Sequence, residues 1–358
     1  MIPFLRGVRT IVALELAQRV RGVAVYVLLG LFALLVAVVT ALAWWTDTAM
    51  GESGGDSGGF LFSTIVYFVL LLGTLLAPAL SGAAVNGDRD AGTLATTQVT
   101  LVSTTQIVVG KFVASWITSL AFLVISLPFL LSCFALGQVS ARTALASLAV
   151  LIVELAVVSA IGVGLSAIIN RPLFSVAATY LVVAALSIGT LIAFGLGGAA
   201  IQTEVRSTTI SIDLGMMPDE QSDDEPVCLP PETYTYSAPR FDLVWGFLAA
   251  NPYVVLADAG SGDFDADGYP ADLFSQFAVF VRGAQIPPET DVVYDECEDY
   301  SSGYSSDYDT AEETWNSTTP SWFVGLAAHV VLAAGLLVWG IARTRTPATR
   351  LPRGQRIA

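Results

Sequence analysis

Six long apolar runs dominate this chain of 358 residues. They cover residues 22–45, 60–84, 110–136, 143–169, 173–200 and 321–341. About 20 apolar residues cross a hydrocarbon core as an α-helix, so every run is long enough to do so. Only helices and closed barrels satisfy their backbone hydrogen bonds in lipid, and long runs without alternation favour helices. The sequence therefore predicts an all-α integral membrane protein with six transmembrane helices.

The charged residues are sorted along the chain, although the net charge is −15. Cytoplasmic loops of membrane proteins are enriched in Lys and Arg. Placing the amino terminus in the cytoplasm puts twelve of the 16 cations on that side: Arg6, Arg9, Arg19, Arg21, Arg89, Lys111, Arg171, Arg343, Arg345, Arg350, Arg353 and Arg356. We therefore expect both termini in the cytoplasm. The acidic excess, in 46–59 and 201–320, then lies outside.

Residues 1–21 precede the first span, and their pattern predicts a cytoplasmic helix in the plane of the membrane interface. One face is apolar, formed by Phe4, Leu5, Val8, Ile11 and Val12. Arg6, Arg9 and Thr10 lie opposite. The alternative is a cytosolic tail whose arginines only orient the spans. A cleaved signal peptide fits less well, because the apolar core exceeds the usual length of about 7–15 residues.

The predicted domains follow from these runs. Spans one to five occupy 22–200, with a polar cytoplasmic segment at 85–109. Residues 201–320 form an extracytoplasmic insertion of mixed strand, short helix and loop. The sixth span covers 321–343, and a basic cytoplasmic tail covers 344–358. Within the insertion, the apolar stretch 241–257 is broken by Asn251-Pro252, which predicts a helix or helix pair packed on the outer mouth of the bundle.

The three cysteines divide between the membrane and the insertion. Cys133 lies in the third span and is expected to be a small buried apolar residue. Cys228 and Cys297 both lie in the insertion, on the side where disulfides persist. The sequence therefore predicts a Cys228–Cys297 disulfide.

Enzymatic chemistry has little support. The chain has no GxxxxGK[ST] phosphate-binding loop, no HExxH and no CxxC, and its single histidine, His329, lies within the last apolar run. We expect no enzyme activity and no directly bound cofactor. Glu154 lies near the middle of the fourth span, where a carboxylate costs about 2.5–3.5 kcal/mol. Glu154 and His329 are therefore candidates for an intramembrane substrate path, the alternative being hydrogen bonds within the bundle.

A carboxylate-rich turn in the insertion resembles the start of a calcium loop. Asp263, Asp265 and Asp267 alternate ahead of Gly268, as calcium ligands do. The twelfth position of such a loop is Phe274 rather than a bidentate Glu. We therefore keep calcium as a possibility and favour the alternative, a turn rich in Asp and Gly.

The polar segment 85–109 carries a family resemblance. Gly87-Asp88-Arg89-Asp90-Ala91-Gly92-Thr93-Leu94, followed by the stretch from Leu101 to Gly110-Lys111-Phe112, resembles the inner loop of type-two ABC-transporter permeases. Leu101 stands where that family usually has Pro, and Ala95 where an acidic residue often follows. The six-span layout, the leading helix, the large loop before the last span and Asn251-Pro252-Tyr253 extend the resemblance to most of the chain.

The resemblance implies a dimeric permease, paired with a second copy or a homologue, that sits on separate cytoplasmic ATPase subunits holding ATP and magnesium. Segment 86–108 would hold a short coupling helix that docks in an ATPase groove. The expected coupling residues are Asp88, Arg89, Asp90, Gly92, Thr93 and Leu94. Such permeases usually export, and the apolar spans favour an amphiphilic, lipid-like or drug-like cargo. We expect membrane lipids, and no nucleic acid, among the partners.

Two other classes of function remain open. The chain could be a membrane-anchored sensor or scaffold whose segment 201–320 binds a ligand. It could also be a membrane enzyme that uses Glu154 and outer Asp residues, which would need several carboxylates at one depth. The Ala/Val-rich spans and short loops are typical of a multi-pass protein of a bacterial cell membrane.

Overall fold

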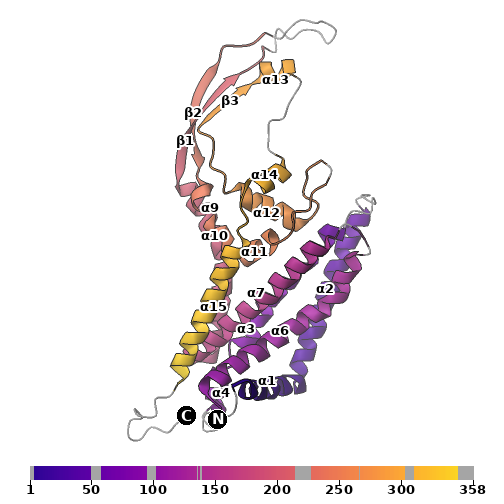
Figure 1. Cartoon of the computed structure of the whole chain (residues 1–358), viewed down its shortest axis with the longest axis vertical. Coiled ribbons are helices and arrows are strands. Elements are labelled where there is room, and N and C mark those ends of the chain that lie inside the picture. Colours follow the sequence, from indigo (N-terminus) through magenta and orange to yellow (C-terminus); the bar gives the residue numbers. More distant parts are fainter. Residues whose placement is uncertain are drawn as a thin grey trace.

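The chain forms a bundle of long helices, with a sheet-bearing insertion at one end and a crossing helix at the other (Figure 1). The computed structural model describes residues 4–49, 58–94, 102–134, 136–137, 139–213, 227–265, 267–302 and 310–345. The secondary structure of these residues is mostly helical, with one small sheet.

Six helices in the described ranges are long and apolar enough to cross a membrane, which confirms the predicted number. Four of them are α2 (Val23–Ala49), α3 (Gly58–Ser81), α6 (Thr104–Phe134) and α7 (Ala141–Ile168). The fifth span joins α8 (Pro172–Ala184), the π-helical turn η1 (Ala185–Gly189) and α9 (Thr190–Ala200). The sixth is α15 (Trp322–Thr344).

One helix begins earlier than its apolar run predicts, because polar residues cap its first turn. Helix α6 begins at Thr104, six residues before the predicted start at 110. The backbone N–H of Ser103 donates to Gln106 Oε1 at 2.7 Å, and the N–H of Gln106 donates to Ser103 Oγ at 3.3 Å. This reciprocal pair is a capping box, which satisfies two backbone donors at a helix start. An apolar count misses such a polar first turn.

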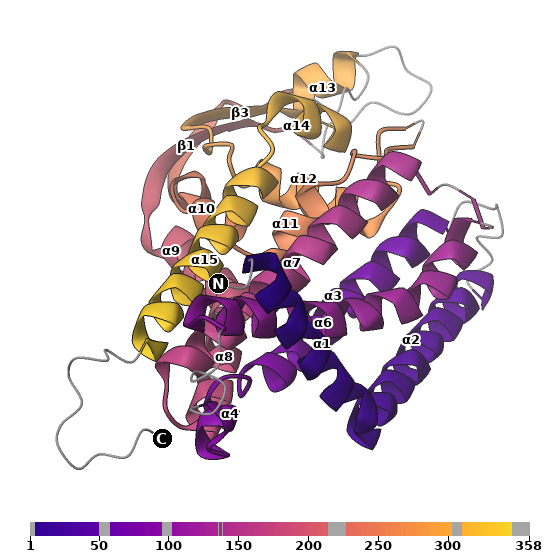
Figure 2. The same cartoon turned by 60° about the horizontal axis from the view of Figure 1, so that its bottom comes forward.

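Helix α1 (Phe4–Arg21) lies across the ends of the spans and packs against α6 (Figure 2). A side chain at Gly7 would collide with Gln106, so the glycine permits this close crossing. Ile11 of the predicted apolar face is buried, whereas Leu5 of the same face is 79% exposed. The helix was predicted correctly, but part of its apolar face contacts the bundle.

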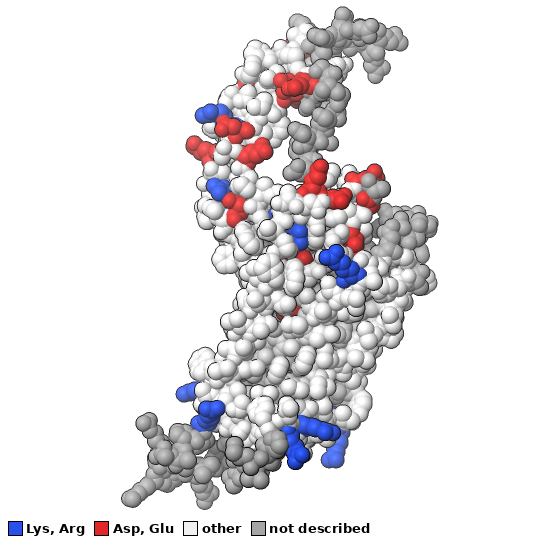
Figure 3. All heavy atoms as spheres, viewed as in Figure 1, with Lys and Arg blue, Asp and Glu red and all other residues white. Residues whose placement is uncertain are grey.

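The two ends of the bundle differ in charge. The basic end carries α1, the short helix α4 (Asn86–Asp90) and the last turn of α15. The acidic end carries the insertion between the fifth and sixth spans. On the face drawn in Figure 3, the basic end shows Lys and Arg only, and Asp and Glu gather over the acidic end. Between the two ends, this face is almost free of charge.

The insertion contains a three-stranded sheet in the order β2-β1-β3. Strand β1 (Gln202–Ile210) is rich in β-branched residues and buries Val205 and Ser207 on one face. It pairs antiparallel with β2 (Glu232–Pro239) and parallel with β3 (Asp291–Asp295). The parallel pairing needs the long crossover from residue 239 to 291, which contains the helices that contact the bundle. The insertion is thus mixed α/β, as predicted.

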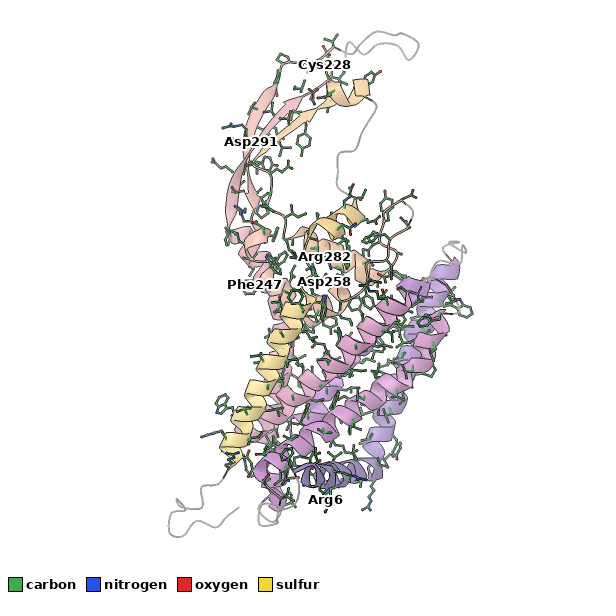
Figure 4. All side chains as sticks on the ribbon, in the orientation of Figure 1. Arg6, Cys228, Phe247, Asp258, Arg282 and Asp291 are labelled. Atoms are coloured by element: carbon green, nitrogen blue, oxygen red, sulfur yellow. A yellow bond between two sulfur atoms is a disulfide. The ribbon has the colours of Figure 1, made fainter. Side chains whose placement is uncertain are left out.

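The predicted disulfide is present between Cys228 and Cys297. Cys297 lies in α13 (Glu296–Ser302), directly after β3, and Cys228 bridges to Ile212 after β1. Figure 4 places Cys228 at the tip of the insertion farthest from the bundle. The bond therefore closes the end of the sheet. Cys133 is a buried free cysteine, also as predicted.

A buried ion pair fastens the insertion to the start of α15. Arg282, in α12 (Leu273–Gly283), donates through Nε to Asp258 Oδ1 at 2.6 Å, and both side chains are at most 5% exposed. The other oxygen of Asp258 accepts from the backbone N–H of Ser321 and, at 3.0 Å, from that of Trp322. A carboxylate at a helix N-terminus is favoured by the helix dipole. The pair (Figure 4) thus links α12 and α15.

Substituting Arg282 with Ala tests this link. The variant leaves Asp258 buried without its ionic partner, which we expect to cost about 3–5 kcal/mol. Arg206→Ala is the matched control, because the Arg206–Asp291 pair is exposed and an exposed pair contributes less than about 1 kcal/mol. Thermal denaturation in detergent should show a large fall in midpoint for Arg282→Ala alone. Equal shifts in both variants would contradict the assigned role.

Candidate functional site

A short break between two helices sits inside the acidic end of the bundle. Helix α10 (Gly246–Ala249) and helix α11 (Pro252–Asp258) meet at Ala250-Asn251, and we call residues 246–258 the elbow. The break falls at the predicted Asn251-Pro252. Most of the elbow is buried. Gly325 of α15 approaches so closely that a Cβ there would overlap the carbonyl of Ala249. The elbow is therefore part of the bundle core.

Glu154 and His329 form a buried pair that contacts the elbow. Glu154 Oε1, from α7, lies 2.8 Å from His329 Nδ1, from α15. His329 Nε2 lies 2.8 Å from the carbonyl oxygen of Ala250. The carbonyl can only accept, so Nε2 carries a proton and donates to it. The pair then holds either an imidazolium with a carboxylate or a neutral imidazole with a carboxylic acid. Both residues are at most 2% exposed.

Asn251 joins the elbow to the fifth span. Its side-chain N–H₂ donates to the carbonyl of Ser187 at 2.6 Å and to Thr190 Oγ1 at 2.9 Å. Ser187 lies in η1, where the π-helical turn departs from regular α-helical hydrogen bonding. Asn251 Oδ1 accepts from the N–H of Tyr253 and so caps α11. One side chain thus satisfies backbone groups on two elements.

An apolar groove of about 800 Å³ opens beside the elbow. One wall is α3, from Thr64 to Leu75, and the other is the fifth span, from Tyr180 to Leu191. The elbow and α12 close its acidic end. A volume of this size matches sites for drug-sized ligands, which are mostly apolar with a few placed polar groups. The groove is therefore the candidate binding site of the described chain.

The structure places Glu154 and His329 in the bundle core and not on this groove. Neither residue lines it, whereas Asn251 and Tyr253 do. The prediction that Glu154 and His329 form a substrate path stays a prediction, and the geometry favours the alternative of hydrogen bonds within the bundle. The two residues are connected to the groove only indirectly, through the elbow to which His329 is hydrogen-bonded.

At the basic end, Lys111 joins three helices through ion pairs. Its Nζ, from α6, contacts Glu15 of α1 and lies 2.6 Å from Asp88 Oδ2 of α4. Lys111 is 2% exposed. A buried ammonium needs such partners, because an unpaired charge is costly to remove from water. Sequence reasoning missed this cluster, although Glu15, the only acidic residue of α1, was a signal for it.

Helix α4 is also held by hydrogen bonds to α7 and to the turn that follows α7. The N–H groups of Val85 and Asn86 donate to Ser166 Oγ at 2.9 and 3.1 Å. Arg89 donates to Asn170 Oδ1 at 2.7 Å. We call α4 with Ala91–Leu94 the joint.

The other expected coupling residues divide between surface and core. Asp90, Gly92 and Thr93 are exposed, and Leu94 is buried. Gly92 adopts a positive φ of 69°, which favours glycine. Residues 95–101 of the predicted coupling segment lie outside the described residues.

Arg19 adds a second fastening of α1. It donates to the carbonyl of Leu80 at 3.1 Å and to the hydroxyls of Ser115 and Thr118 at 3.0 and 3.1 Å. Burial lowers the pKa of Arg19, which Glu15 partly opposes. An arginine guanidinium is so strongly basic that it stays charged despite this shift. The parts of α3 and α6 at the basic end are thus tied to α1.

The Asp-rich turn uses its carboxylates for local hydrogen bonds. Asp263 accepts from Thr143 of α7 at 2.8 Å and from Ser261 at 3.1 Å. Asp265 accepts from the backbone N–H groups of Asp267 and Tyr269. In the described ranges, no three His, Cys, Asp or Glu side chains gather closely enough to hold a metal ion. The favoured alternative of an Asp-rich turn describes this geometry, and calcium binding stays a possibility without structural support.

Comparison with known proteins does not assign the chain to a family. No protein-family model matches the chain, and no curated protein matches it either.

A double-mutant cycle tests whether Glu154 and His329 act as a pair. Glu154→Leu or His329→Leu alone leaves one buried polar partner behind, which we expect to cost about 3–5 kcal/mol. The double variant should be far less destabilised than the sum, because it removes both partners. The readout is the thermal denaturation midpoint in detergent, with Ser159→Ala on the same helix as a control. Additive effects would show that the two side chains do not interact.

Proposed function

We propose that this chain is the membrane-spanning subunit of a transporter driven by a separate ATPase, as its resemblance to type-two ABC permeases implies. The observation that carries the proposal is the joint at the basic end. It presents Asp90, Gly92 and Thr93 at the surface, while its base is tied to α1 and α6 through Lys111 and to α7 through Ser166. Such a joint can pass the motion of a docked partner to several spans.

The charge distribution supports a cytoplasmic basic end. Lys and Arg favour the cytoplasmic side of a membrane, and the helices α1 and α4 lie at the end where these residues gather. An ATPase in the cytoplasm would then meet the joint directly. The acidic insertion would lie outside the cell membrane.

The groove supports an amphiphilic cargo. Its walls are almost wholly apolar, and its hydroxyls are largely engaged: Tyr180 donates to the carbonyl of Leu75, and Thr74 to that of Leu71. A cargo there would be held by apolar contact. In this proposal a second permease copy completes the transport path, and ATP and magnesium belong to the partner.

Cross-linking at the joint tests the proposal. Asp90→Cys, labelled with a photo-reactive maleimide in native membranes, should capture a P-loop ATPase identified by mass spectrometry. Its yield should change when ATP is added. Glu232→Cys on the exposed strand β2 is the matched control and should capture no ATPase.

Failure of Asp90→Cys to capture an ATPase would contradict the coupling role. Equal capture from both positions would do so too. A stable complex of the insertion with a small ligand, and no ATPase partner, would instead favour the sensor alternative.

A further inference from the structure

Aromatic side chains are concentrated on the groove. Six of its twenty lining residues are aromatic: Tyr67, Phe68, Tyr180, Tyr253, Phe277 and Phe280. Phe277 and Phe280 are 50% and 64% exposed, so their rings are available to a ligand. Aromatic faces carry negative electrostatic potential and attract cations. The groove therefore combines an apolar surface with a preference for positive charge.

Tyr67 is the centre of this aromatic cluster. Its ring centroid lies 5.0 Å from that of Phe274, 5.7 Å from that of Phe277 and 6.3 Å from that of Tyr253. These rings come from α3, the elbow and α12, and the elbow contributes Tyr253. Recognition of quaternary ammonium groups uses such groups of rings.

The charges near the groove are negative. None of its lining residues is charged. Asp272, the N-cap of α12, lies two residues before Phe274, whose ring packs against that of Tyr67. Burial raises the pKa of the Asp272 carboxyl and so favours its neutral form, whereas the hydrogen bond from the N–H of Ser275 favours the charged carboxylate.

The single cation of α12, Arg282, is already neutralised by an ion pair. The guanidinium of Arg282 pairs with Asp258 and stacks on the ring of Trp315, 3.4 Å from its centroid. The whole insertion is acidic: residues 201–320 hold 24 Asp and Glu against three Arg. An anion that approached the groove would meet repulsion, and a cation would be attracted.

We propose that the groove binds lipophilic cations, meaning molecules with an apolar body and one positive charge, such as quaternary ammonium or phosphonium compounds. The body would lie between α3 and the fifth span, and the charge would lie among the rings of Tyr67, Tyr253 and Phe277. This deepens the proposed function by naming its cargo class. The binding itself requires no ATPase.

Two probes of equal shape and opposite charge test the proposal. Tetraphenylphosphonium and tetraphenylborate are each titrated against the full chain in phosphatidylcholine nanodiscs, with empty nanodiscs subtracted. We expect saturable tetraphenylphosphonium binding, at least roughly tenfold tighter than that of tetraphenylborate. Equal affinities would show that the groove selects only for apolarity, as for a lipid chain. Tighter tetraphenylborate binding, or no saturable binding, would also overturn the proposal.

Single substitutions locate the site. Tyr67→Leu and Phe277→Leu remove a ring and should each weaken tetraphenylphosphonium binding about three- to tenfold, whereas Tyr67→Phe keeps the ring and should change it little. Asp272→Asn keeps the helix cap but removes the charge, and should reduce the preference for the cation. Phe60→Leu, an exposed ring of α3 that does not line the groove, is the matched control. Unchanged binding in Tyr67→Leu and Phe277→Leu would place the cation elsewhere.

The result of the cation-binding experiment can be distinguished from the result of the ATPase cross-linking experiment. Selective cation binding without ATPase capture at Asp90 would support the site and reject the transporter. ATPase capture without cation selectivity would support the transporter and reject this cargo class.

Discussion

The elbow places backbone polar groups in the core of an apolar bundle, and the rest of the acidic end depends on how these groups are satisfied. An unpaired carbonyl in such a place costs as much as a lost hydrogen bond or more. His329 meets the carbonyl of Ala250, and Glu154 holds His329. Asn251 donates to the carbonyl of Ser187, which lies in the π-turn. Glu154, His329 and the irregular fifth span are therefore all connected through the elbow.

Helix α7 connects the two ends of the molecule. Near its basic end Ser166 accepts from the base of α4, and near its middle Glu154 holds His329. In its first turn Thr143 donates to Asp263 of the insertion. The joint, the elbow and the Asp-rich turn thus share one helix, so a tilt of α7 would move all three. The same tilt would also move part of the aromatic cluster on the groove, because Tyr253 belongs to the elbow.

The sequence predicted the features that depend on composition and local pattern. These are the six spans, the mixed insertion, the Cys228–Cys297 disulfide and the helix break at Asn251-Pro252. They could be predicted because the length of an apolar run, the side of the membrane and the geometry of proline can each be judged from one stretch of sequence. Helix ends were displaced where polar caps extend a span, as at Thr104.

The contacts that assemble the site could not be predicted, because they join residues far apart in the chain. Lys111 and Glu15 are 96 positions apart, and Glu154 and His329 are 175 apart. No local pattern predicted the π-turn, whose Ser187 carbonyl accepts from the distant Asn251. The groove is a product of the packing of α3, the fifth span, the elbow and α12. The coupling segment and the Asp-rich turn had recognisable patterns, yet Asp88 and Asp263 are engaged by partners that those patterns do not specify.

The most direct test of the account is hydrogen–deuterium exchange of the elbow in nanodiscs, followed by mass spectrometry. If the elbow is held in the core by Glu154, His329 and Asn251, peptides covering 248–258 should take up deuterium as slowly as those from α7. Exchange as fast as that of the same peptides in the unfolded chain would show that the elbow is not seated in the bundle, and would contradict the account.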